Sequence, residues 1–142
     1  MASRADHRPA GLSRRSAAAI FSTEWPDPST VVVSVRGELD AASAPDFIDF
    51  VLTRLPHTQR LVLDFSTVDF FGTSAFSAIH VISVQAAGVG AQWVLVTNAR
   101  VNRLLGICDP EGVLPCCDDL RGAVPFLERG AGRLLQLVPK LR

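Results

Sequence analysis

Short apolar runs and longer segments with apolar residues at helical spacing alternate along the chain. Runs dominated by valine, leucine, isoleucine and aromatic residues are typical of buried strands. Segments with apolar residues three or four positions apart predict helices that bury one face. The predicted strands cover residues 17–25, 31–35, 61–65, 93–96 and 113–114.

Four helices are predicted from this spacing together with the residues at their ends. Serine, threonine or aspartate is favoured at a helix start, and glycine or proline just after its end. The predicted helices run from Ser43 to the residue before Pro56, from Thr73 or Ser74 to about Ala87, across residues 101–105, and from Asp118 or Asp119 through Leu127. Between these elements, residues 37–40 are interpreted as a polar loop and residues 66–69 as a turn.

The order of the elements predicts the fold class. After two opening strands, strands and helices alternate, which favours a sheet with parallel pairs and crossover helices. We therefore expect an α/β fold with a mixed sheet of four to five strands packed by about four α-helices. The domain is expected to span residues 16–130, with a disordered tail at 1–15 and a second tail at 131–142 after a glycine-rich break.

The charge balance and the hydropathy of the chain narrow the classes of partner. Lys plus Arg and Asp plus Glu both number 14, so the formal net charge is zero. Because proteins that bind nucleic acid usually carry a basic stripe, no direct nucleic-acid contact is expected. No apolar stretch approaches the roughly 18 residues of a membrane helix, and the start lacks a signal-peptide pattern. We expect a cytoplasmic protein without membrane contact, present as a monomer or weak dimer.

Recognisable catalytic and metal-binding motifs are missing from the sequence. There is no Gly-x-Ser-x-Gly elbow, no His-Glu-x-x-His pair and no Walker lysine, and the three histidines are scattered. Cys116 and Cys117 are adjacent, which is poor spacing for a metal site, and with Cys108 they make an odd number. We expect no enzyme activity, metal or cofactor, and interpret the cysteines as small, partly buried hydrophobic residues. A redox response or a nucleophilic role of Cys116 and Cys117 is the alternative.

Two stretches are not explained by the fold alone. One is the polar segment 36–40, directly after a predicted buried strand, and the other is Phe70–Phe76. In the second, Thr73 and Ser74 place two hydroxyl groups at a predicted helix start, after Gly72. The hydroxyls could cap the free amides of the first turn. They could also accept a phosphate, which the same amides and the helix dipole would stabilise.

Together these stretches resemble the STAS domain, and within it the bacterial anti-sigma factor antagonists, over about residues 17–128. Residues 33–40, which end in Gly-Glu-Leu-Asp, look like one hallmark of that family. Residues 61–74 look like the second hallmark, where the family usually has Asp-Ser-Ser-Gly-Leu-Gly and phosphorylates the first serine. Thr73 falls on the phosphoacceptor and Ser74 on the second serine. The chain departs from the pattern next to them, because Gly72 replaces the aspartate, and Ala75, Phe76 and Ser77 replace Gly-Leu-Gly.

This resemblance implies regulation of transcription by partner switching. Such an antagonist binds an anti-sigma factor, in many systems an ATP-dependent serine/threonine kinase, until the kinase phosphorylates it. The residues implied for the docking face are Glu38, Asp40, Gly72, Thr73, Ser74 and Phe76, with Thr73 as the phosphoacceptor and Ser74 as the second choice. A regulatory STAS domain that is never phosphorylated is one alternative. A module that senses a nucleotide or another anion near Asp40 and Thr73 is another.

Overall fold

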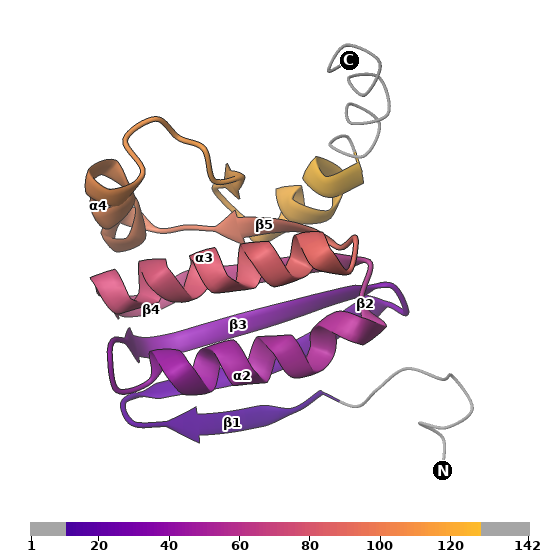
Figure 1. Ribbon diagram of the computed structural model, residues 1–142, viewed down its shortest axis with the longest axis horizontal. Helices are drawn as coiled ribbons and strands as arrows, with labels where there is room; N and C mark the ends of the chain where they lie inside the picture. The colour runs from indigo at the N-terminus through magenta and orange to yellow at the C-terminus, as the bar shows by residue number, and fades with distance from the viewer. Residues whose placement is uncertain (1–10, 129–142) are drawn as a thin grey trace.

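The computed structural model describes residues 11–128, which form a six-stranded mixed sheet with helices on both faces (Figure 1). The strands lie in the sheet in the order in which they occur in the chain. They are β1 (Ser13–Ser16), β2 (Ala19–Asp27), β3 (Thr30–Leu39), β4 (Arg60–Phe71), β5 (Gln92–Val96) and β6 (Cys116–Cys117). The pairs β1–β2 and β2–β3 are antiparallel, and all later pairs are parallel.

The parallel pairs are connected by helices, as crossover connections require. The helical elements are α2 (Ala44–Arg54), η1 (Leu55–His57), α3 (Thr73–Gly88), α4 (Ala99–Cys108) and η2 (Leu120–Gly122), and residues 123–128 are also helical. Figure 1 shows α2 and α3 side by side across one face of the sheet, and the two helices contact each other. The predicted α/β fold is confirmed, with six strands instead of four to five.

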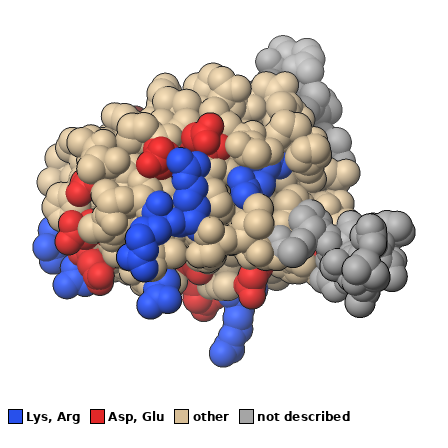
Figure 2. Space-filling view, turned by 90° about the horizontal axis from the view of Figure 1, so that it is seen from below, with Lys and Arg blue, Asp and Glu red and all other residues tan. Residues whose placement is uncertain are grey.

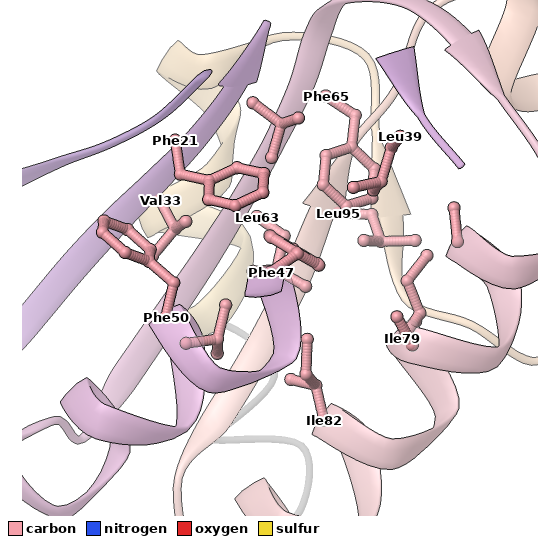
Figure 3. Close-up of a cluster of buried hydrophobic side chains, with 14 of the residues drawn as sticks. Phe21, Val33, Leu39, Phe47, Phe50, Leu63, Phe65, Ile79, Ile82 and Leu95 are labelled. Carbon is pink, nitrogen blue, oxygen red and sulfur yellow. The ribbon is translucent and has the colours of Figure 1, made fainter. Parts of the chain in front are cut away.

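The main hydrophobic core lies between the sheet and helices α2, α3 and α4. Four phenylalanine rings form a chain of contacts through it, with ring centroids 5.5–5.7 Å apart. These rings belong to Phe21, Phe47, Phe50 and Phe65, and a fifth ring, that of Phe71, joins Phe65 at the end of β4. Figure 3 shows Phe21, Phe47 and Phe50 gathered between the strands and α2.

A smaller core covers part of the opposite face of the sheet. Its members are Val32, Val62, Val94 and Val96 from the strands, together with Ala123 and Leu127. Alternation along the strands explains the division, because successive side chains point to opposite faces. Leu63, for example, is fully buried in the main core, whereas its neighbour Val62 is fully buried in the smaller one.

Two predicted interruptions of strands are wrong. The segments 37–40 and 66–69 were expected to be a loop and a turn, but β3 continues to Leu39 and β4 to Phe71. Each strand supplies the other with hydrogen-bonding partners, and the register shifts between Ser34 and Arg36 and again between Gly37 and Glu38. Such β-bulges let polar and glycine-containing segments stay paired, so the pairing overrides the local sequence signal.

The boundaries of the sheet also differ from the prediction. Residues 13–15, which fall in the predicted tail 1–15, belong to the edge strand β1. Arg14 holds this strand to α2 through ion pairs with Asp46 (3.0 Å) and Asp49 (3.2 Å). The last strand lies at 116–117 and not at 113–114, because the Asp109 carboxylate accepts the N–H groups of residues 113 and 114 and shapes them into a loop. Residues 1–10, the break at 130–132 and the tail 131–142 lie outside the described residues.

Candidate docking site at the carboxyl edge of the sheet

The two polar stretches identified in the sequence meet where β3 and β4 end. Glu38 pairs with Phe70 and Leu39 with Phe71, and the Gly72 N–H then donates to the Leu39 carbonyl oxygen at 3.1 Å. The starts of α2 and α3 therefore lie at the same edge of the sheet, together with α4 (Figure 1). Because β3 and β4 are parallel, their carboxyl ends bring residues 30 positions apart into one site, as is general for such sheets.

Gly37 sets the path of the chain into this site. Its φ is +91°, a conformation that favours glycine. A Cβ atom on Gly37 would lie 2.2 Å from the carbonyl oxygen of Ala18 in the turn between β1 and β2. The same oxygen accepts the Glu38 N–H at 3.0 Å. The close approach of the two backbones, which only glycine permits, thus fixes the position of Glu38, whose side chain is exposed.

Asp40 is used in building the start of α2. Its Oδ1 atom accepts the N–H groups of Ala42 (3.0 Å) and Ser43 (3.2 Å). The Ser43 hydroxyl accepts the Asp40 N–H and donates to the Glu38 carbonyl oxygen. Ser43 is the N-cap residue as predicted, but it makes no side-chain hydrogen bond to the first turn of α2. Asp40 and Ser43 together therefore stiffen the loop that carries Glu38 to the edge of the sheet.

Helix α3 begins at Thr73 without a side-chain cap. Gly72 is the N-cap residue, and neither Thr73 nor Ser74 caps the first turn, contrary to the simpler prediction. The Thr73 side chain is exposed and forms no hydrogen bond within residues 11–128. An uncapped first turn leaves amides that can bind an anion, and α3 has no acidic residue in that turn.

The absence of a side chain at Gly72 leaves room for the Phe70 ring. A Cβ atom at Gly72 would lie 3.1 Å from Cε2 of Phe70, closer than ordinary van der Waals contact. Phe70 is 50% exposed although it is a large apolar residue. An exposed aromatic ring therefore lies beside the start of α3, where the resemblance to the STAS family leads one to expect a carboxylate.

The predicted docking residues differ in their surroundings. Glu38, Asp40 and Thr73 lie at the edge where β3 and β4 end. Ser74 lines a groove between α2 and α3 of about 270 Å³, whereas Phe76 is partly buried against the main core. Residues two positions apart on a helix point in different directions, so Ser74 and Phe76 lie on different sides of α3.

A second groove lies beside Phe70, and it was not predicted from the sequence. It has a volume of about 270 Å³ and lies between the end of β4 and helix α4. Its lining residues are Asp69, Phe70, Phe71, Arg100, Arg103, Leu104 and Ile107. One feature of the sequence could have indicated the groove: α4 has apolar residues on two sides. Val101 and Leu105 are buried in the core, whereas Leu104 and Ile107 line the groove.

Asn98 holds α4 against β4 beside this groove. Its Oδ1 atom accepts the Val101 N–H at 2.9 Å and caps the helix, and its Nδ2 atom donates to the carbonyl oxygens of Ser66 (3.2 Å) and Val68 (2.8 Å). The ladder between β4 and β5 ends at Asp64 and Val96, so these two carbonyls lie past the last residue of β5. The side chain of Asn98 therefore continues the hydrogen bonding that β5 no longer provides.

Burial acts against the reactivity of Cys116 and Cys117. Burial, with smaller contributions from Asp109 and Cys117, raises the pKa of the Cys116 thiol to about 11. Burial also raises the pKa of Cys117, whose thiol donates to the Asp119 carbonyl oxygen. Both groups therefore remain thiols near neutral pH, and the thiolate is the nucleophilic form. Within residues 11–128, no cluster of three or more His, Cys, Asp or Glu side chains could hold a metal ion.

Charges of both signs are mixed on the face on the β1 side of the molecule, where Figure 2 shows arginines interspersed with carboxylates. The ion pairs of Arg14 with Asp46 and Asp49 belong to this part of the structure.

None of the helices in the described part of the chain has the length and apolar character needed to cross a membrane.

Comparison with known proteins identifies the family. Residues 26–123 match the sequence model of the STAS domain. The chain is 32% identical over 111 residues to Osmosensory protein A of Mycobacterium tuberculosis, an alignment that covers 75% of this chain and 70% of that protein.

Solved structures show the same fold. An anti-sigma factor antagonist from Mycobacterium paratuberculosis is 20% identical with a TM-score of 0.68, over 84% of this chain and 95% of that one. A putative anti-sigma factor antagonist from Thermotoga maritima is also 20% identical, with a TM-score of 0.69, over 76% and 94%. The match to the family model covers more than half of the sequence, and the fold agrees with it. The chain belongs to the STAS domain family.

Proposed function

We propose that this protein is an anti-sigma factor antagonist, which binds an anti-sigma factor through the edge where β3 and β4 end. The observation that carries the proposal is the pairing of Leu39 with Phe71, which places Glu38 and the exposed Thr73 hydroxyl at one edge. The similarity of the fold to an anti-sigma factor antagonist and to a putative one supports the same role. In this proposal the protein is not an enzyme and supplies a rigid docking surface.

We further propose that Thr73 is the site at which phosphorylation ends binding. A phosphate on Thr73 would lie beside the uncapped first turn of α3, whose amides stabilise negative charge, so the helix tolerates it. It would add roughly −1.5 to −2 charges to a surface that a partner must desolvate. The anti-sigma partner would then be the serine/threonine kinase that supplies the phosphate from ATP.

The test combines the protein with recombinant anti-sigma kinases encoded in the same genome, with ATP, followed by intact-mass measurement. We expect a mass increase of one phosphate that is lost in Thr73→Ala and kept in Ser74→Ala. In a binding assay without ATP, Thr73→Glu should weaken the complex by about tenfold or more, because it adds a charge inside the interface. Equal binding by wild type and Thr73→Glu would remove Thr73 from the docking face, and binding to no anti-sigma factor would refute the function.

A regulatory STAS domain that is never phosphorylated is the second candidate, and Gly72 favours it. The family has a carboxylate at this position, whereas here the Phe70 ring lies next to Gly72. The variant Gly72→Asp separates the two candidates, because the Phe70 side chain is flexible enough to give way to the new Cβ. If only Gly72→Asp accepts phosphate, the wild-type protein acts by binding alone.

A further inference from the structure

Residues 11–128 are acidic as a group, with eight arginines, no lysine and thirteen aspartates and glutamates. Against this background, Arg100 and Arg103 lie together in the groove between β4 and α4. The ion pairs formed within these residues are those of Arg14, so neither Arg100 nor Arg103 forms an ion pair with a carboxylate of the described domain. Asp69 also lines the groove, which leaves two arginines against one carboxylate. The groove is thus a local basic site on an acidic domain.

Apolar side chains make up much of the lining of the groove, and two of them are well exposed. Phe70 is 50% exposed and Ile107 is 73% exposed, and the partly buried Leu104 also lines the groove. Arg103 and Leu104 lie three and four residues after Arg100, and Ile107 lies four and three residues after them, so the four side chains share one side of α4. Large apolar side chains gathered in a concavity and bordered by charge are typical of interaction sites and not of ordinary surface.

We propose that this groove binds an acidic segment of a partner protein, with one bulky apolar side chain inserted between Phe70 and Ile107. Carboxylates that flank this side chain would pair with Arg100 and Arg103, whose guanidinium groups suit bidentate contacts. The groove volume of about 270 Å³ accommodates a side chain, whereas pockets for small molecules are usually about 300–1,000 Å³.

The terminal segments of this chain are poor occupants because of their charge. Residues 1–10 contain two arginines and one aspartate, and residues 129–142 contain three arginines, one lysine and no acidic residue. Both segments would bring positive charge to Arg100 and Arg103. A separate acidic partner is therefore the occupant that the charges favour. The groove binds it independently of any phosphate on Thr73 and adds a second docking element next to the proposed one.

The test uses three synthetic twelve-residue peptides and the full-length protein. The first peptide intersperses leucine and phenylalanine with glutamate and aspartate, the second replaces the acidic residues with lysine, and the third replaces the apolar residues with serine. Binding is followed by changes in backbone amide NMR shifts and by fluorescence anisotropy. Only the first peptide should shift the amides of Phe70, Arg103 and Ile107, with an affinity that falls as salt is added.

Variants with matched controls decide whether the groove is responsible. The double variant Arg100→Glu and Arg103→Glu should bind the first peptide about tenfold or more weakly than wild type. Arg121 is an exposed arginine on η2, and Arg121→Glu should leave the affinity for this peptide unchanged. Phe70→Ala should weaken binding without altering the circular dichroism spectrum.

Three outcomes would overturn the proposal. The first is that amide shifts fall outside the groove or that the lysine peptide binds equally well. The second is that ATP shifts the groove amides while the acidic peptide does not, which would make the groove a nucleotide site. The third is a concentration-dependent dimer that Arg100→Glu with Arg103→Glu abolishes, which would make a second copy the occupant. No anti-sigma factor enters this experiment, so its failure is distinct from failure of the proposed function.

Discussion

At Gly37, a backbone with φ of +91° lies against the carbonyl oxygen of Ala18, so two independent constraints act on one residue. Replacement by alanine carries two costs. The new residue must adopt a backbone conformation that L-amino acids disfavour, and its Cβ atom would lie 2.2 Å from the Ala18 carbonyl oxygen. We expect Gly37→Ala to lower the free energy of unfolding by about 3 kcal/mol. Urea denaturation followed by circular dichroism measures this loss.

Gly90 is the matched control for this prediction. Its φ is +74°, but a Cβ atom there would meet nothing within 4 Å. Gly90→Ala should therefore lose only the conformational preference, about 1–2 kcal/mol. If the two variants lose equal stability, the contact with Ala18 is not a constraint on the strand end, and the placement of Glu38 needs another cause.

The same residues show what a sequence reveals at this scale and what it leaves out. The Gly-Glu-Leu-Asp segment and the hydroxyls at 73 and 74 could be identified from the sequence as a candidate site because they follow predicted buried strands. The continuation of β3 through Leu39 was not, since it depends on hydrogen bonds from a strand 30 residues away. The use of Asp40 to build the start of α2 was hidden for a similar reason. A polar residue looks the same in sequence whether its side chain binds a partner or its own backbone.

In helix α4, one asparagine, Asn98, both caps the start of the helix and bonds it to β4. Asn98→Ala removes the cap and leaves two strand carbonyls without their side-chain donor. We expect a loss of about 2 kcal/mol in the free energy of unfolding. We also expect faster amide hydrogen exchange in residues 99–108, because α4 loses its cap and its side-chain hydrogen bonds to β4 while the packing of Val101 and Leu105 remains.

Asn102→Ala serves as the control within the same helix. Asn102 is exposed, and alanine is the better helix former, so stability should stay within about 0.5 kcal/mol of wild type or rise slightly. Unchanged stability in Asn98→Ala would show that solvent replaces its three hydrogen bonds at no cost.

Helices and strands with a strong periodic apolar pattern were predictable from the sequence. Those whose formation depends on contacts with distant parts of the chain were less so. The segment Thr73 to about Ala87 was predicted as a helix and is α3, because its apolar residues and the following glycines agree. β1 is polar in sequence, Ser-Arg-Arg-Ser, and forms because β2 offers an edge to pair with; the exposed ion pairs of Arg14 with α2 add little. The groove beside α4 was missed because its lining residues come from two elements separated in the chain.

At the scale of the whole molecule, the sheet has a core on each of its two faces, and the smaller one closes with the last described helical turn. Leu127, 3% exposed, packs there over Val62 and Val94. Leu127→Ala should lower the free energy of unfolding by about 2–3 kcal/mol through lost burial and the cavity left behind. Leu120→Ala is the control, because Leu120 is 40% exposed and should lose under about 1 kcal/mol.

The shape of the transition tests whether the two cores unfold together. Leu63 belongs to the main core and Val62 to the smaller one, so neither core can unfold without disturbing strand β4, which both share. We therefore expect Leu127→Ala to shift the urea midpoint without changing the slope, and tryptophan fluorescence and circular dichroism to give coincident curves. If the curves separate in Leu127→Ala alone, the end of the described chain unfolds as an independent unit. The docking edge formed by β3 and β4 would then keep its structure after the opposite face has opened.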